Sequence, residues 1–292
     1  MPAIVATERK KNNDMIQPQL HIAYFQQAIA WEDPAANYQM VEKAFGSLSS
    51  KMDILVVPET FNTGFSDNMA AMAEPPEGAT LDFARRMAKQ NDALFVGTWT
   101  VRQKDGGVVN RLHWVFPDGN YGYYDKGHTF RMSSEASQLV RGTKKALFEW
   151  RGWHIKPAIC YDLRFPRWLR NGVPASELYK LPGNGVERPK EDVALDYDLL
   201  LVCANWPGSR HEAWSTLLKA RAIENLCYVV GVNRTGVDGV GIPYTGNCAA
   251  IDFKGMELSH CEPEQAQVQT ATLDFEALQT FRRHWPFYLD FD

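Results

Sequence analysis

Apolar residues along this chain gather into short continuous runs separated by polar segments. Several runs are rich in Val, Ile and Leu, which is typical of strands whose faces are covered by other layers. Turn-forming residues lie between them, as at residues 118–120. We therefore predict strands at residues 20–25, 52–57, 93–100, 111–116, 154–160, 198–204, 227–232, 247–253 and 268–273.

Helical periodicity occurs between several of these runs. Residues 37–45 and 80–90 carry apolar side chains at helical spacing. The strongest pattern spans residues 212–226, where Trp214 and Leu218 share one face. Helices that alternate with strands in both halves of the chain predict an α/β fold.

The chain has 292 residues with a composition ordinary for a globular protein. It has no internal repeat or low-complexity linker, so we predict one domain at residues 18–275, preceded by a polar tail at residues 1–17. Residues 172–196 are rich in proline, glycine and charge, and we expect an insertion loop there that acts as a lid or an oligomer contact. The aromatic residues of the tail at 276–292 should dock on the body or on a partner subunit.

Charge and cysteine usage exclude several classes of protein. The net charge is −4 and no segment forms a basic stripe, so we expect no nucleic-acid partner. We expect no secretory signal, because the polar N-terminal segment lacks an apolar core, and no apolar run reaches the roughly 18 residues that a membrane helix needs. The 5 cysteines form no Cys-x-x-Cys pair, and no metal-binding spacing of histidines occurs. These features favour a cytoplasmic protein without a disulfide framework or a metal site.

Cys160 ends an apolar run, and a polar, helix-like segment follows it at once. A thiol there lies beside the N–H groups that open a helix, where its pKa falls and donors are free to hold an oxyanion. A buried structural cysteine is the alternative, and it is the commoner case for a cysteine considered alone.

A thiol nucleophile also needs a base and an oxyanion stabiliser. His128, His154 and His211 are candidate bases, although His154 lies within a predicted strand, where packing is the commoner role. Carboxylates and amines offer a second set of candidates.

Glu59 and Lys126 belong to this second set, and each follows a strand-like run. Ligands gather at the carboxyl ends of strands in α/β sheets. We therefore expect Glu59, Lys126 and Cys160 to meet in one site.

The residues around these positions carry a resemblance to a known family. Residues 58–61 (PETF), 124–128 (YDKGH) and 160–166 (CYDLRFP) resemble, in order, the signature segments of the nitrilase superfamily of carbon–nitrogen hydrolases. The resemblance implies a four-layer αββα sandwich that assembles as a dimer or larger homo-oligomer. It also implies site roles: Glu59 as general base, Lys126 as oxyanion stabiliser, Cys160 as nucleophile, Glu135 as a second glutamate, and the backbone N–H of Tyr161 as an oxyanion donor.

Residues 160–166, followed by 204–207 (ANWP), are similar to the omega-amidase branch of that superfamily. This implies hydrolysis of small amides of 2-oxo dicarboxylates, such as 2-oxoglutaramate and 2-oxosuccinamate, through a thioester and without a cofactor. Gly127, Thr129 and residues 246–248 depart from the branch pattern. N-carbamoyl amidohydrolase, aliphatic amidase and nitrilase activities stay open, as does a non-catalytic binding protein on the same fold.

An oxo-acid substrate needs a partner for its carboxylate, and arginine provides bidentate geometry. Arg210 is our candidate, with Arg164 and Arg131 as alternatives. Trp206 and Phe65 could wall the pocket, although aromatic residues at strand ends more often pack in a core.

Overall fold

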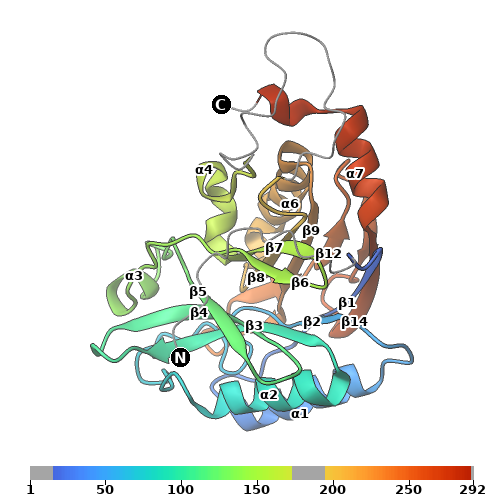
Figure 1. Ribbon diagram of the computed structural model, residues 1–292. Helices are drawn as coiled ribbons and strands as arrows, with labels where there is room; N and C mark the ends of the chain where they lie inside the picture. The colour runs from blue at the N-terminus through green and yellow to red at the C-terminus, as the bar shows by residue number, and fades with distance from the viewer. Residues whose placement is uncertain (1–15, 173–194, 291–292) are drawn as a thin grey trace.

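The computed structural model describes residues 16–172 and 195–290. Most of the predicted polar tail and most of the predicted insertion loop lie outside the described residues. Two 6-stranded sheets pack face to face (Figure 1). The first sheet runs in the order β14 (Gln267–Asp274), β1 (Gln19–Gln26), β2 (Ile54–Val56), β3 (Leu94–Arg102), β4 (Val108–Val115) and β5 (Tyr121–Asp125).

The second sheet has the same plan. It runs in the order β13 (Glu257–His260), β12 (Ala249–Ile251), β9 (Tyr228–Asn233), β8 (Leu199–Ala204), β7 (Trp153–Ile159) and β6 (Phe148–Trp150). In the first sheet β1, β2 and β3 are parallel, and in the second sheet β7, β8 and β9 are parallel. A short hairpin of β10 (Thr235–Val237) and β11 (Pro243–Thr245) stands apart from both.

Helices cover the outer faces of the two sheets. α1 (Pro34–Gly46) and α2 (Ala79–Asn91) pack on the first sheet, and α6 (His211–Asn225) packs on the second (Figure 1). The order of layers is therefore helix, sheet, sheet, helix, which confirms the predicted fold class. The short elements are η1 (Cys160–Arg164), α4 (Pro166–Leu169), η2 (Gly208–Arg210), α3 (Glu135–Gln138) and, at the C-terminal end, α7 (Phe275–His284) and η3 (Phe287–Asp290).

Alternation along each strand explains how one sequence fills three apolar layers. On β1, Ile22 and Tyr24 face the second sheet, whereas Ala23 packs under α1 and α2. On β8, Leu201 faces the first sheet and Val202 packs under α6. Burial of an Ile, Leu or Val side chain contributes about 1.5–3 kcal/mol, so the apolar pattern strongly determines which face of each sheet packs against which layer.

Helix ends follow local chemistry. Asp33 caps α1 by accepting a hydrogen bond from the N–H of Ala36 at 3.0 Å, and Pro34 opens the helix. α6 ends at Leu226, whose backbone is left-handed at φ +49°. The carbonyl of Leu226 accepts a hydrogen bond from Arg282 of α7 at 2.9 Å. Arg282 also pairs with Asp198 at 2.7 Å, so α7 docks on the body.

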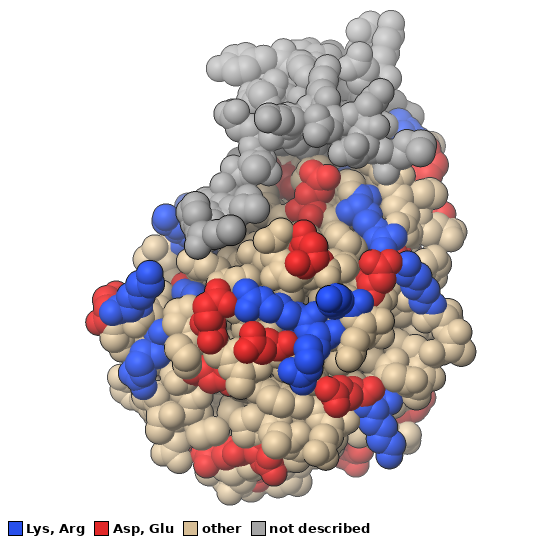
Figure 2. All heavy atoms as spheres, turned by 60° about the horizontal axis from the view of Figure 1, so that its bottom comes forward, with Lys and Arg blue, Asp and Glu red and all other residues tan. Residues whose placement is uncertain are grey.

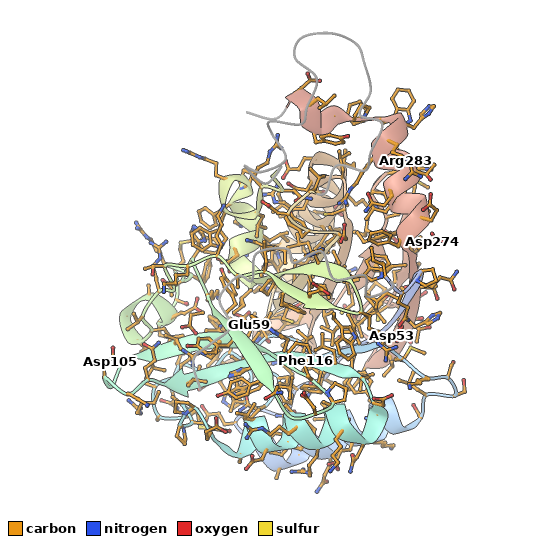
Figure 3. The ribbon with its side chains drawn as sticks, in the orientation of Figure 1. Asp53, Glu59, Asp105, Phe116, Asp274 and Arg283 are labelled. Carbon is orange, nitrogen blue, oxygen red and sulfur yellow. The ribbon has the colours of Figure 1, made fainter. Side chains whose placement is uncertain are left out.

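The topology brings the carboxyl ends of four strands to one place. β2 and β5 of the first sheet run in the same direction, as do β7 and β8 of the second. Residues that follow these strands therefore meet where the two sheet edges face each other. Figure 3 places Glu59 in this interior region.

Candidate active site

Glu59, Lys126 and Glu135 form a fully buried ionic cluster. Lys126 Nζ lies 2.8 Å from Glu59 Oε1 and 2.8 Å from Glu135 Oε1. None of the three side chains is more than 1% exposed. The backbone N–H of Phe130 donates to Glu135 Oε2 at 2.6 Å and fixes that carboxylate. One ammonium is therefore held between two carboxylates. Burying these three charges costs several kcal/mol of desolvation free energy per ion, which favours a functional role for the cluster.

The electrostatics follow from this arrangement. Burial alone would lower the pKa of Lys126, but Glu135 and then Glu59 outweigh burial and raise that pKa above its ordinary value. Burial raises the pKa of Glu135, and Lys126 opposes the rise. Lys126 thus stays a cation at neutral pH and can stabilise negative charge.

Cys160 lies at the end of β7, where the chain turns into η1. Its backbone is left-handed at φ +43°, a conformation that costs a non-glycine residue about 1–3 kcal/mol. Thr60, directly after Glu59, is left-handed as well, at φ +42°. The sharp turns at both strand ends aim the base and the thiol at the same space.

The expected fall in the pKa of the Cys160 thiol is wrong for this structure. Burial raises that pKa well above its ordinary value, Glu59 raises it further, and Lys126 only partly offsets them. The helix-opening position cannot compensate, because η1 is a single short turn. The thiol therefore carries its proton at neutral pH, and attack requires a base that removes the proton.

Two asparagines that sequence reasoning did not single out complete the cluster. Asn110 Nδ2 donates to Glu59 Oε1 at 2.7 Å. The backbone N–H of Asn205 donates to Glu59 Oε2 at 2.7 Å, and its carbonyl accepts a hydrogen bond from Cys160 Sγ at 3.8 Å. Asn205 lies in the quoted segment 204–207 and follows β8, so its strand-end position was a usable signal. Asn110 lies within β4 and gave none.

The three candidate histidines have other partners. His128 Nδ1 lies 2.7 Å from Asp162 Oδ1. His154 pairs with Asp198, and His211 Nδ1 lies 2.9 Å from the carbonyl of Gly208. Glu59, in contrast, belongs to the ionic cluster and lies beside the Cys160 thiol, which makes a carboxylate the better candidate for the base.

Aromatic and cationic residues surround the cluster. The ring of Phe65 lies 5.5 Å from Lys126 Nζ. Tyr161 follows Cys160 in η1, and its ring packs edge-on against Phe130 at 5.2 Å. Trp206 is 3% exposed, and its Nε1 donates to the carbonyl of Arg210 at 2.9 Å.

The candidate arginines lie on the surface beside these rings. The guanidinium of Arg210 lies 5.3 Å from the ring of Phe130, and that of Arg164 lies 4.8 Å from the ring of Trp206. Neither arginine forms an ion pair with any residue in the described ranges. Arg131 is exposed on the loop that leads to Glu135.

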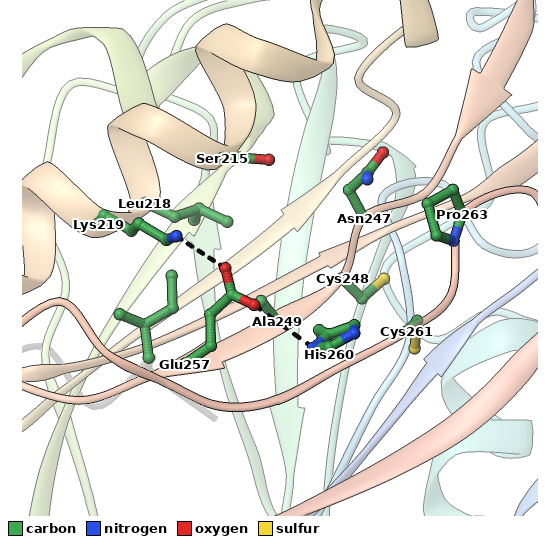
Figure 4. Close-up of a pocket in the computed structure, with 11 residues that line it drawn as sticks. Ser215, Leu218, Lys219, Asn247, Cys248, Ala249, Glu257, His260, Cys261 and Pro263 are labelled. Atoms are coloured by element: carbon green, nitrogen blue, oxygen red, sulfur yellow. Dashed lines mark ion pairs between the residues drawn. The ribbon is translucent and has the colours of Figure 1, made fainter.

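A separate hollow of about 200 Å³ lies between α6 and the strands β12 and β13 (Figure 4). Lys219 and His260 both pair with Glu257 at its rim. It contains none of the residues of the ionic cluster.

Basic and acidic side chains are interspersed on the face shown in Figure 2. None of the helices in the described part of the chain has the length and apolarity needed to cross a membrane.

Comparisons with known proteins agree with this geometry. The family model described as carbon-nitrogen hydrolase matches residues 21–283. The omega-amidase YafV of Yersinia enterocolitica is 40% identical over 94% of this chain and 97% of its own length. The 2-oxoglutaramate amidase of Bacillus subtilis is 27% identical over 92% of this chain and 96% of its own length.

A solved structure agrees as well. XC1258 from Xanthomonas campestris, described as a CN-hydrolase superfamily protein with an arsenic adduct in its active site, is 42% identical to this chain. The match covers 94% of this chain and 97% of that one, with a TM-score of 0.85.

Proposed function

Because this chain belongs to the carbon-nitrogen hydrolase family, we propose that it is an omega-amidase that hydrolyses the terminal amide of small 2-oxo dicarboxylates. The resemblance to the nitrilase superfamily found in the sequence is confirmed by the family match. The observation that carries the proposal is the buried Lys126 between two carboxylates, beside the thiol of Cys160. The name of one relative, 2-oxoglutaramate amidase, supports 2-oxoglutaramate as a substrate, and the resemblance to the omega-amidase branch implies 2-oxosuccinamate as a second.

The first half of the reaction forms a thioester. Glu59 takes the proton of the Cys160 thiol as the sulfur attacks the amide carbonyl carbon. Lys126 Nζ and the backbone N–H of Tyr161 hold the oxyanion of the tetrahedral intermediate. Glu59 then gives its proton to the amide nitrogen, the C–N bond breaks, ammonia leaves, and the acyl group stays on the sulfur.

The second half releases the acid. Glu59 takes a proton from water as the water oxygen attacks the thioester carbon, and the same two donors hold the oxyanion. The C–S bond breaks and the sulfur regains its proton from Glu59. Glu135 takes no proton in this scheme. It keeps Lys126 charged and in place through contacts at 2.8 and 3.0 Å.

Arg210 and Arg164 supply the positive charge that a 2-oxo acid needs. Each lies over an aromatic ring and has no described acidic partner that would compete with a substrate carboxylate. Arg164 is in η1, on the same short element as Cys160. Stacking on a ring restricts a guanidinium without using its N–H donors, which leaves them free for bidentate pairing.

Ammonia release from a substrate panel tests the proposal. The panel contains 2-oxosuccinamate, 2-oxoglutaramate, a neutral aliphatic amide, an N-carbamoyl amino acid and a simple nitrile. We expect the two oxo-amides to give the highest kcat/KM, with loss of activity in Cys160→Ala and retention in Cys227→Ala, a buried cysteine outside the cluster. Preference for the carbamoyl compound or the nitrile would reject the omega-amidase assignment.

A further inference from the structure

We propose that His128 is a positioning residue that holds the nucleophile loop against the lysine loop through Asp162. The inference rests on the catalytic roles given above. His128 lies two positions beyond Lys126, and Asp162 lies two positions beyond Cys160. The His128–Asp162 contact therefore runs beside the pair of residues that must react together.

The contact has the features of a strong hydrogen bond. His128 Nδ1 lies 2.7 Å from Asp162 Oδ1, and the aspartate side chain is fully buried. A carboxylate only accepts hydrogen bonds, so Nδ1 of His128 carries the hydrogen. The other oxygen, Asp162 Oδ2, accepts from Tyr124 OH at 2.8 Å and from the N–H of Ile159 at 3.2 Å. Asp162 thus joins β5 and the loop after it to the end of β7.

Neighbouring rings fix the orientation of the histidine. His128 stacks on Phe165 with ring centroids 3.7 Å apart and planes at 8°, and Trp168 meets it edge-on at 5.1 Å. Trp168 Nε1 also donates to Tyr124 OH at 2.8 Å. A Cβ atom at Gly127 would lie 2.6 Å from the Trp168 ring. Gly127, one of the departures from the branch pattern, is thus what lets Trp168 close over this contact.

The two-sheet architecture makes this His128–Asp162 contact, called the brace below, necessary. Lys126 follows a strand of the first sheet and Cys160 follows a strand of the second. The packing between the sheets is apolar and non-directional, so it sets their spacing without fixing the loops to a fraction of an ångström. A displacement of about 1 Å at a reacting centre can cost a factor of roughly 100 in rate. Directional hydrogen bonds to Asp162 constrain the loops of Lys126 and Cys160 relative to each other.

Substitutions of His128 separate its hydrogen bond from its bulk. His128→Phe keeps a ring on Phe165 and removes the donor, whereas His128→Asn keeps a donor near the position of Nδ1. We expect His128→Phe to lower kcat about 10- to 100-fold with KM nearly unchanged. His128→Asn should recover kcat to within about 3-fold of wild type. His113→Phe is the matched control, because His113 stacks on Trp99 at 3.7 Å in the outer apolar layer, whereas Tyr124 faces the inner one, and the His113 ring makes no hydrogen bond in the described structure.

A second readout does not depend on the substrate. Iodoacetamide forms a thioether with the Cys160 sulfur, and iodide leaves, so its rate reports how well Glu59 activates the thiol. That rate should fall in His128→Phe in step with kcat, and it should recover in His128→Asn. If the alkylation rates behave so but no amide is hydrolysed, the proposed substrate fails and the brace stands.

A double-mutant cycle with Asp162→Asn measures whether His128 and Asp162 act through the same contact. We expect the double variant His128→Phe/Asp162→Asn to be no slower than Asp162→Asn alone, since Asp162→Asn already disturbs the contact with His128 together with those of Tyr124 and Ile159. Near-ultraviolet circular dichroism confirms that each variant is folded. Wild-type kcat and alkylation rate in folded His128→Phe would overturn the proposal, as would equal losses in His128→Phe and His128→Asn.

Discussion

Asn205 joins the two sheets at the carboxylate of Glu59. Its backbone N–H donates to Glu59 Oε2 at 2.7 Å, and its side-chain amide donates to the backbone carbonyl of Glu59 at 2.6 Å. The same amide also reaches Thr60 Oγ1 at 2.8 Å. One residue after β8 therefore fixes both the carboxylate and the turn that carries it.

Removing the Asn205 side chain should damage both catalysis and folding. Asn205→Ala keeps the backbone hydrogen bond to Glu59 and loses the two side-chain bonds, each worth about 0.5–1.5 kcal/mol. We expect kcat to fall about 10-fold or more, and the free energy of unfolding to fall by about 1–3 kcal/mol. Steady-state kinetics and urea unfolding measure the two effects. A wild-type kcat would show that the turn at Thr60 holds without Asn205.

Glu59→Gln isolates proton transfer from shape. The amide has the size of the carboxylate but cannot take a proton, and burial keeps the Cys160 thiol protonated at neutral pH. Loss of general base catalysis should lower kcat about 100- to 10,000-fold. Iodoacetamide should also alkylate Cys160 more slowly in this variant. Alkylation at the wild-type rate would mean that another group takes the thiol proton.

The two arginines should act on substrate binding. Arg210→Ala should raise the KM for 2-oxosuccinamate about 10-fold while kcat changes less, because one charge-assisted hydrogen bond is worth about 1.5–3 kcal/mol. Arg164→Ala should behave in the same way. A neutral aliphatic amide provides the control, because its KM should not respond to either change. An unchanged KM for the oxo-amide would show that the substituted arginine does not bind the substrate carboxylate.

The buried Lys156 side chain should make the free energy of unfolding depend on pH. It is 4% exposed on β7, and burial, followed by repulsion from Lys145, lowers its pKa to about 8. Below pH 8 the ammonium is charged in both the folded and the unfolded chain, so the folded chain carries the whole cost of burying it. Between pH 8 and the ordinary value of 10.5 the folded chain loses the proton first, and the cost fades.

Lys156→Met should therefore raise the free energy of unfolding by about 1–3 kcal/mol at pH 7. The gain should shrink toward pH 10. Urea unfolding of both proteins at the two pH values measures it, with the exposed Lys89→Met as control. A gain that is equal at pH 7 and pH 10 would show that the methionine acts by packing alone.

The hydrophobic pattern predicted the central strands because a strand that is covered on both faces, such as β8, has a continuous apolar run. It did not predict β6 and β13. Both are short edge strands, and most of β13 is exposed, so neither has a distinctive pattern. The long loop at residues 172–196 remains a prediction, since most of it lies outside the described residues.

The candidate site could be read from the sequence only where residues follow strand ends. Glu59, Lys126 and Cys160 gave that signal, and the structure brings them together through contacts that include 2.8 Å between Lys126 and Glu59. Asn110 gave no signal because its role depends on the register between β4 and β5. The pKa of Cys160 could not be predicted, because burial and two nearby carboxylates depend on long-range packing.

Mass spectrometry of the enzyme quenched in acid during turnover of 2-oxosuccinamate tests the central claim most directly. We predict that the peptide containing Cys160 gains the mass of the substrate less ammonia, and that the adduct is lost on treatment with hydroxylamine. An adduct on any other residue, or turnover at the wild-type rate after Cys160 is alkylated, would contradict the account.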